Sequence, residues 1–185
     1  MLCWNSKLPS LRCWAPVLML SCGGGGDTGD LDACLGGGEA SLVIGYGVGG
    51  EFNPYVDGAL VGLEVAPQGG FGVPVRLQTT GLRVRANASD TANPEAPYAS
   101  VNVVLDTYID GTLSASFLND TAVAYCQADG TGLMWDLVVG FDAEKYTNEN
   151  LIDLHGTVAS LVVEAIDADG VAASNSVSVQ ISLEE

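Results

Sequence analysis

The amino-acid sequence predicts an all-β protein, an antiparallel β-sandwich of about seven to nine strands. Short segments in which apolar and polar residues alternate follow one another at roughly ten-residue spacing. Three Asp-Gly pairs, at 110–111, 129–130 and 169–170, separate such segments and supply the positive φ angles of tight turns. Helical periodicity never extends over about 12 residues, and only residues 144–151 indicate a helical turn. These observations favour two packed sheets over a helical fold.

Each expected strand is defined by this alternation. In residues 71–79, Val73, Val75 and Leu77 alternate with Pro74, Arg76 and Gln78, which predicts one buried and one solvent-facing side. Because proline has no N–H for the ladder, Pro74 predicts that its segment lies at a sheet edge or a bulge. The segments that fit strands are 41–46, 59–65, 71–79, 82–86, 99–108, 112–118, 122–127, 133–141, 157–166 and 173–183.

The N-terminus has the layout of an export signal. Lys7 and Arg12 precede a short apolar run, residues 14–21, that ends at Cys22 and is followed by glycines. A membrane-spanning helix is not expected, since about 20 apolar residues are needed to cross a bilayer. We therefore expect a signal peptide over 1–21, a flexible Gly/Asp-rich tether over 22–38 and one domain over 39–185.

The run Met19-Leu20-Ser21-Cys22 resembles the lipobox of bacterial lipoproteins. The resemblance implies that Cys22 is acylated and becomes the N-terminus of a chain anchored in the outer membrane, on its periplasmic or its surface side. Two alternatives stay open: an ordinary signal peptide cut near Ser21, which would give a secreted protein, and a buried segment with no role in export.

The cysteine count is consistent with export. Cys3 and Cys13 would leave with the signal peptide and Cys22 would be lipidated, so two thiols would remain in the mature chain. In an oxidising compartment these two, Cys34 and Cys126, are expected to form a disulfide. Two separate buried thiols are the alternative.

The composition limits the class of partner. The 185 residues include 23 acidic and 6 basic side chains, for a net charge of −17. Nucleic acid and anionic membrane surfaces are disfavoured partners, because both carry negative charge. Hydrophobic residues make up 48% of the chain, which favours a packed core over an acidic disordered chain.

Two further resemblances concern the domain. Residues 165–170 and 174–183 resemble the last hairpin of bacterial Ig-like and fibronectin-type domains, which implies an Ig-like sandwich; Trp135, Tyr125 and Phe141 are expected to supply its aromatic core. Residues 66–71, Ala-Pro-Gln-Gly-Gly-Phe, resemble a Pro-Gln-Gly-Gly-aromatic element of uncharacterised envelope lipoproteins. Gly72 stands where many of those proteins have a histidine, which argues against a histidine-based ligand role. The element is either a structural turn or a ligand-contacting loop.

Few residues indicate catalysis. His155 is the only histidine, and Asp153 would share its face on a strand. No Gly-x-Ser-x-Gly motif supplies a nucleophile, and Cys126 lies in an alternating segment like a core thiol. We expect a protein that is not an enzyme, with no catalytic residues and no cofactor.

Calcium is the one metal to weigh. Asp167 and Asp169, with Glu164, bring oxygen donors to one turn, but calcium takes six to eight oxygen ligands and the segment is much shorter than a calcium loop. These residues are weak calcium candidates, and a solvated turn is favoured.

The sequence thus predicts a non-enzymatic cell-envelope lipoprotein that presents a β-sandwich to a protein or polysaccharide partner. The alternative is a calcium- or carbohydrate-binding module, secreted or displayed at the surface. Exposed aromatic rings on one face would favour stacking on sugars. The tyrosines expected near strand ends are Tyr46, Tyr55, Tyr98 and Tyr108.

Overall fold

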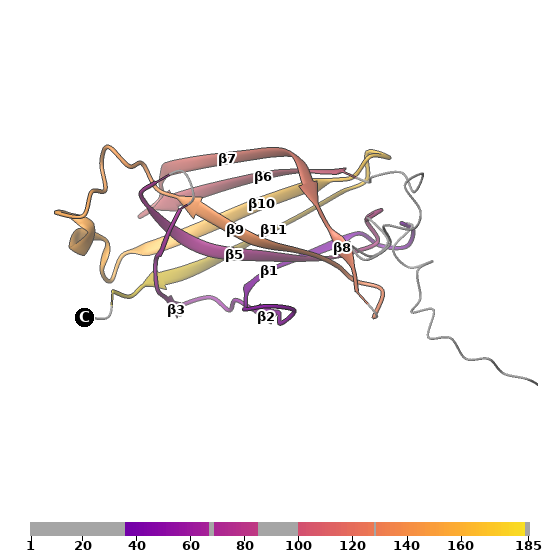
Figure 1. Cartoon of the computed structure of the whole chain (residues 1–185), viewed down its shortest axis with the longest axis horizontal. Coiled ribbons are helices and arrows are strands. Elements are labelled where there is room, and N and C mark those ends of the chain that lie inside the picture. Colours follow the sequence, from indigo (N-terminus) through magenta and orange to yellow (C-terminus); the bar gives the residue numbers. More distant parts are fainter. Residues whose placement is uncertain (1–35, 67–68, 85–99, 128, 184–185) are drawn as a thin grey trace, which may run out of the picture.

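The structure, a computed structural model, describes residues 36–66, 69–84, 100–127 and 129–183. This part of the chain forms two β-sheets that pack face to face (Figure 1). The predicted all-β sandwich is therefore confirmed. Among the described residues, no helix is both long and apolar enough to cross a membrane.

The first sheet has the order β2-β1-β5-β9-β8, and β4 also pairs with β5. Its strands are β1 (Ser41–Tyr46), β2 (Asn53–Pro54), β4 (Glu64–Val65), β5 (Phe71–Thr80), β8 (Tyr125–Cys126) and β9 (Gly132–Gly140). The second sheet has the order β3-β11-β10-β6-β7. Its strands are β3 (Ala59–Val61), β6 (Ser100–Ile109), β7 (Thr112–Val123), β10 (Val158–Ile166) and β11 (Ala172–Ile181).

The pairing order is that of an immunoglobulin-like sandwich. In that fold the sheets are A-B-E-D and C-F-G, and β1-β5-β9-β8 and β6-β10-β11 follow the same orders along the chain. β7 is an additional strand beside β6, and β3 runs parallel to β11 where the other pairs are antiparallel. The Ig-like architecture predicted from the last hairpin is thus the one observed.

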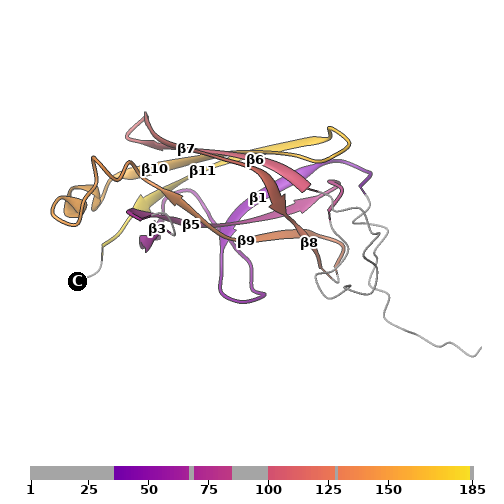
Figure 2. The same cartoon turned by 45° about the horizontal axis from the view of Figure 1, so that its top comes forward.

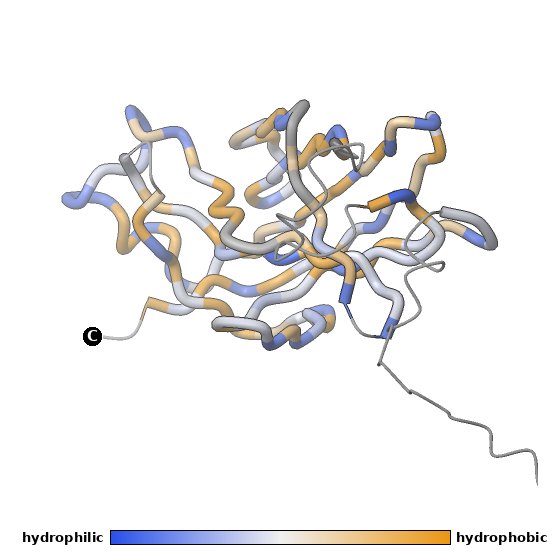
Figure 3. The backbone as a smooth tube through the Cα atoms, turned by 45° about the vertical axis from the view of Figure 1, so that its right-hand side comes forward, coloured by the Kyte–Doolittle hydropathy of each residue, from blue (hydrophilic) through white to orange (hydrophobic). Residues whose placement is uncertain are grey.

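The core is built from the inward side of each alternating strand. Val103 and Leu105 of β6 and Leu161 and Val163 of β10 have no exposed surface. They belong to one apolar cluster with the inward residues of β5. Hydrophobic and hydrophilic positions alternate along the strands accordingly (Figure 3). Burying an aliphatic side chain of this size stabilises the fold by about 1.5–3 kcal/mol.

The expected aromatic core is confirmed at Phe141 and not at Tyr125, and for Trp135 it stays a prediction. Phe141 is buried and packs edge-on against Tyr146, with ring centroids 5.9 Å apart. Tyr125 is only half-buried, and the side chain of Trp135 lies outside the described residues. The core is mainly aliphatic because its central strands carry Val, Leu and Ala at their inward positions.

Two expected strands are divided because the chain crosses between the sheets. The segment 59–65 forms β3, which pairs with β11, and then β4, which pairs with β5. The expected strand 122–127 is divided between the end of β7, which also contains the expected strand 112–118 and pairs with β6, and β8, which pairs with β9. Residues 82–84, the described part of the expected strand 82–86, belong to none of the sheets' strands.

The helical turn lies later than expected. Residues 144–151 form turns, and the helical element is a 3₁₀ helix, η2 (Leu151–Leu154), with only Leu154 buried. The short strand β2 had no signal in the sequence, because its two residues, Asn53 and Pro54, show no alternation.

Pro74 lies in a central strand whose pairing with β9 shifts register between Val75 and Leu77, so of the two expected alternatives the bulge is found near it and the sheet edge is not. Its neighbour on one side is Val138 of β9. On the other side, β4 pairs with β5 only up to Gly72 and β1 pairs only from Arg76, so Pro74 faces the gap between them. Its missing N–H therefore costs no ladder hydrogen bond, and its carbonyl accepts a hydrogen bond from the Tyr55 hydroxyl (2.9 Å).

The sandwich has two distinct ends. At the Gly36 end, Gly36 lies beside Arg83, whose guanidinium pairs with Asp169 in the β10–β11 turn. At the Leu183 end lie η2, the β6–β7 turn and the end of β11. Both views of the ribbon show these ends on opposite sides of the molecule (Figures 1 and 2).

The β6–β7 turn tests the turn chemistry that the sequence predicts. Asp110 has φ 46° and Gly111 φ 78°, the two positive values of a type I′ hairpin. We expect Gly111→Ala to lower the free energy of unfolding by about 1 kcal/mol, through backbone strain alone, because an added Cβ would meet no atom within 4 Å. Urea unfolding measures the change.

Gly132→Ala is the comparison, because here the constraint is packing. Its Cβ would lie 2.6 Å from Thr79 Oγ1 and 2.7 Å from Val84 Cγ1, so we expect a loss of about 1–3 kcal/mol from overpacking. Equal stability of this variant and the wild type would show that the packing between β5 and β9 is looser than described.

Candidate functional site

The acidic turn between β10 and β11 uses its carboxylates for structure. Oδ2 of Asp167 accepts the N–H of Arg83 (2.8 Å), and Oδ1 accepts the N–H groups of Asp169 and Val171 (both 2.9 Å). Asp169 faces the Arg83 guanidinium, and Glu164 is exposed on the outer side of β10. The described residues contain no group of three side chains that could hold a metal ion. Asp167 and Asp169 therefore shape the turn, and both carboxylate oxygens of Asp167 already accept hydrogen bonds.

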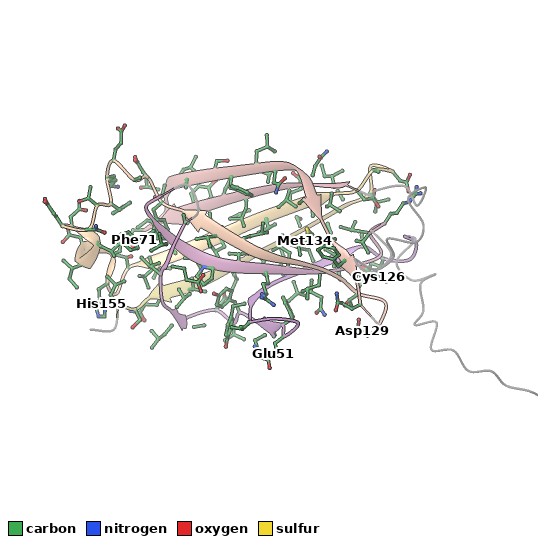
Figure 4. The ribbon with its side chains drawn as sticks, in the orientation of Figure 1. Glu51, Phe71, Cys126, Asp129, Met134 and His155 are labelled. Carbon is green, nitrogen blue, oxygen red and sulfur yellow. The ribbon has the colours of Figure 1, made fainter. Side chains whose placement is uncertain are left out.

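His155 and Asp153 do not share a strand face, so that inference is wrong. Asp153 lies in η2 and His155 directly follows it. Nδ1 of His155 accepts the N–H of Leu183 (3.1 Å), which fastens the last described residues to the helix. Figure 4 shows His155 at the Leu183 end.

The tyrosines do not form one exposed aromatic face. Tyr55 is buried, and its ring stacks on that of Tyr46 with centroids 4.9 Å apart. Tyr108 is half-buried on the other sheet, and Tyr98 lies outside the described residues. Burial is the largest cause that raises the pKa of Tyr55 above its usual value of 10.0, followed by the charges of Tyr46 and Glu64.

Cys126 takes part in a disulfide and lies in β8, at the Gly36 end (Figure 4). It is the only cysteine among the described residues. Cys22 and Cys34 lie outside that part of the chain, so the lipidation of Cys22 and the pairing of Cys34 with Cys126 stay predictions.

The Pro-Gln-Gly-Gly-aromatic element joins β4 to β5. Pro67 and Gln68 lie outside the described residues, and Gly69 and Gly70 have φ angles of 92° and 79°. The N–H of Ala66 donates to the carbonyl of Gly70 (3.0 Å). The described residues thus make a tight turn, and Gly70 and Phe71 also line a hollow of about 420 Å³.

A larger hollow, which we call the leucine groove, lies at the Leu183 end. Its volume is about 680 Å³, and its lining comes from three segments that are far apart in the sequence. These are Leu60 of β3 with Gly62 and Leu63 after it, Leu151 and Ile152 of η2, and Ser182 and Leu183 after β11. Leu60 is 69% exposed and Ile152 is 62% exposed. Large apolar side chains gathered on a concave surface mark an interaction site more often than scattered ones do.

A second hollow, which we call the edge cleft, lies between β7 and β9 and has a volume of about 440 Å³. Ser116, Phe117 and Asn119 line it from β7, and Leu137, Val138 and Gly140 line it from β9. Both hollows fall within the 300–1,000 Å³ typical of ligand sites.

The charges around the Leu183 end are mostly negative. The exposed acidic side chains there include Glu64, Asp110, Asp142, Glu144, Glu149 and Asp153. Lys145 lies at the same end, with its ammonium 4.9 Å from the centre of the Tyr146 ring. An interaction with the Tyr146 side chain is the largest cause that raises the pKa of Lys145. The Leu183 end therefore combines an apolar hollow, the leucine groove, with exposed carboxylates on the surrounding surface.

Sequence reasoning did not find either hollow. The signal for the leucine groove was present in part, because Gly62 interrupts an apolar strand pattern next to two leucines. The edge cleft had no local signal, since it depends on where β7 leaves the second sheet.

The chain matches no family model, and no characterised protein matches it in sequence.

The Tyr55 hydroxyl gives a pH-dependent test. A raised pKa means that the fold favours the protonated hydroxyl, so the stability it contributes is complete below pH 10 and is lost as the pH rises above 10. Tyr55→Phe removes the hydrogen bond to Pro74, and we expect it to cost about 1 kcal/mol at pH 7. Above pH 10 the variant should lose stability less steeply than the wild type. Urea unfolding at pH 7 and pH 11 measures both effects; parallel losses in the two proteins would contradict the assignment.

The turn assignment of Asp167 gives a second test. Asp167→Asn places an amide group among N–H donors, and we expect a loss of about 1–3 kcal/mol. The exposed Asp153→Asn is the control and should change stability by less than about 0.5 kcal/mol. Millimolar calcium should leave the melting temperature of the wild type unchanged. A calcium-dependent rise that Asp167→Asn abolishes would restore the metal hypothesis.

Proposed function

We propose that this protein is a non-enzymatic cell-envelope lipoprotein whose β-sandwich is a binding module for a protein partner. The anchor in the proposal is an acyl group on Cys22, and residues 22–38 are its tether. The observation that carries the binding role is the leucine groove, a hollow of about 680 Å³ lined mainly by leucine and isoleucine.

The position of the groove supports this proposal. The tether would join the domain at the Gly36 end, and the groove lies at the opposite end (Figure 1). A sandwich held from its Gly36 end would turn the groove away from the anchoring membrane. The groove would then be accessible to a partner in the envelope.

The chemistry of the groove favours a protein over a polysaccharide. Five of its seven lining residues are Leu or Ile, and an exposed apolar surface of this kind is typical of a protein–protein interaction site. Sugar recognition would rely on exposed aromatic faces, and in the stacked pair of Tyr46 and Tyr55 the ring of Tyr55 is buried.

The test is site-specific photocrosslinking in the native envelope. A chain with benzoylphenylalanine at position 152 is expressed, irradiated in cells and recovered from the membrane fraction. We expect a discrete adduct with one partner, and we expect mass spectrometry to find diacylglycerol on Cys22. Leu60→Glu should reduce the adduct about tenfold or more, because it places a charge in an apolar contact.

Val48→Glu is the matched control. Val48 is 83% exposed in the β1–β2 loop and lines none of the hollows described above, so this variant should keep the adduct. A native chain that begins at Met1 and carries no lipid would contradict the anchor. An adduct that Leu60→Glu and Val48→Glu leave equally strong would contradict the binding role of the groove.

A further inference from the structure

One side of the sandwich is closed, and the opposite side is not. On the closed side β1 and β11 approach each other, and Nδ2 of Asn175 donates to the carbonyl of Leu42 (2.8 Å). On the other side lie β7, which has a neighbouring strand on one edge only, and β9, which has a neighbour on its second edge over only part of its length. The edge cleft occupies the space between them.

Both strands have open edges within the described part of the chain. β7 is the last strand of its sheet and pairs with β6. β9 pairs with β5 along its length, but β8 accompanies it only at Leu133 and Gly132. Open edges of this kind present backbone N–H and C=O groups to which a further strand can bind.

The core is incompletely covered at this cleft. Phe117 pairs with Leu105, and Leu137 pairs with Val75. Both partners are inward-facing and at most 1% exposed, whereas Phe117 and Leu137 are only half-buried. Apolar side chains that face the core and still reach solvent would be covered by a strand added along β7.

The stretch Ala115–Asn119 lacks the charged side chains and prolines that usually protect an edge strand from pairing with another chain. It contains no charged residue and no proline, and Leu118 is 70% exposed. Register shifts border it at both ends, near Ser114 and near residues 120–121. Ser114 also has a buried hydroxyl that makes no hydrogen bond within the described structure. The regular part of the edge is therefore short, uncharged and open.

The charges around the cleft indicate the chemistry of its occupant. Asp106 accepts a hydrogen bond from the Ser116 hydroxyl, and Asp142 and Glu144 are exposed beside Phe141. A second copy of this chain would bring the same carboxylates together, which costs energy. A partner with Lys or Arg around its apolar residues would be attracted.

We propose that the edge cleft binds an extended segment of a partner protein as an added β-strand along Ala115–Asn119, with alternate apolar side chains beside Phe117 and Leu137 and with Lys or Arg at its ends. The inference rests on the proposed function only for the class of partner, and it concerns a surface different from the leucine groove. Backbone hydrogen bonds would supply affinity, and the two core side chains would select apolar residues at every second position.

The test uses the purified mature chain and a defined probe. The probe is an acetylated and amidated nine-residue peptide with valine at alternate central positions and two lysines at each end. We expect calorimetric binding, together with slower hydrogen exchange of amides in Ala115–Asn119. A peptide with the same side chains but N-methylated alternate amides should bind about tenfold more weakly, because it lacks about two backbone hydrogen bonds.

A matched pair of variants locates the site. Ser116→Lys places an ammonium on the open edge and should weaken peptide binding about tenfold or more. Ser160→Lys introduces the same charge on β10, a central strand with neighbours on both sides, and should bind like the wild type. Both serines lie on the outer side of the same sheet.

Several results would overturn the inference. These are no binding of the peptide, binding without protection of Ala115–Asn119, and equal affinity of the N-methylated peptide. A dimeric mass in light scattering, with β7 protected in the absence of peptide, would mean that a second copy fills the edge. None of these results affects crosslinking at position 152, so failure here is distinguishable from failure of the leucine groove.

Discussion

The burial of one side of each sheet against the other is the interaction on which the rest of this structure depends. Val103 and Leu105 of β6 and Leu161 and Val163 of β10 have no exposed surface, and each alternates with a solvent-facing residue. A shift of the β6–β10 pairing by one residue would turn all of them outward. This constraint fixes the register of both central strands and, through them, the positions of the turns that end each hairpin.

Two of the passages of the chain between the sheets, β3 to β4 and β7 to β8, account for both candidate sites. The passage from β3 to β4 brings Leu60 and Leu63 to the Leu183 end, where η2 and the end of β11 complete the leucine groove. After β7 the chain leaves the second sheet and forms β8, which pairs with β9 only at Leu133 and Gly132. The rest of that edge of β9 is left beside the edge cleft. The edge cleft therefore follows from the strand order. The opposite side of the sandwich is closed because β1 and β11 lie against each other there.

Features that depend on neighbouring residues were predictable from the sequence. β1 has the bounds that its alternation predicts, and the pair Asp110-Gly111 has the two positive φ angles of its turn. Features that depend on distant partners were not predictable. Pro74 is tolerated in a central strand because two partner strands stop on either side of it, and Arg76 is only 6% exposed because the β1–β2 loop supplies carbonyls from Gly49 and Glu51.

The candidate sites follow the same division. Acidic residues that cluster in the sequence, Asp167 and Asp169, hold a turn together. The leucines of the leucine groove cannot be told from core leucines in the sequence, because hydrophobic periodicity does not reveal whether another element of the fold covers a side chain.

Native-state hydrogen exchange of the mature chain tests most directly whether the β7–β9 side of the sandwich is open. Backbone N–H groups of an edge strand alternate between its one partner and solvent. We expect amides along Ala115–Asn119 to alternate between protection like that of β6 and rapid exchange, while amides of β6 and β10 exchange only on global unfolding. Uniform protection of β7 at the level of β6 would mean that its outer edge is already paired, and the account would be wrong.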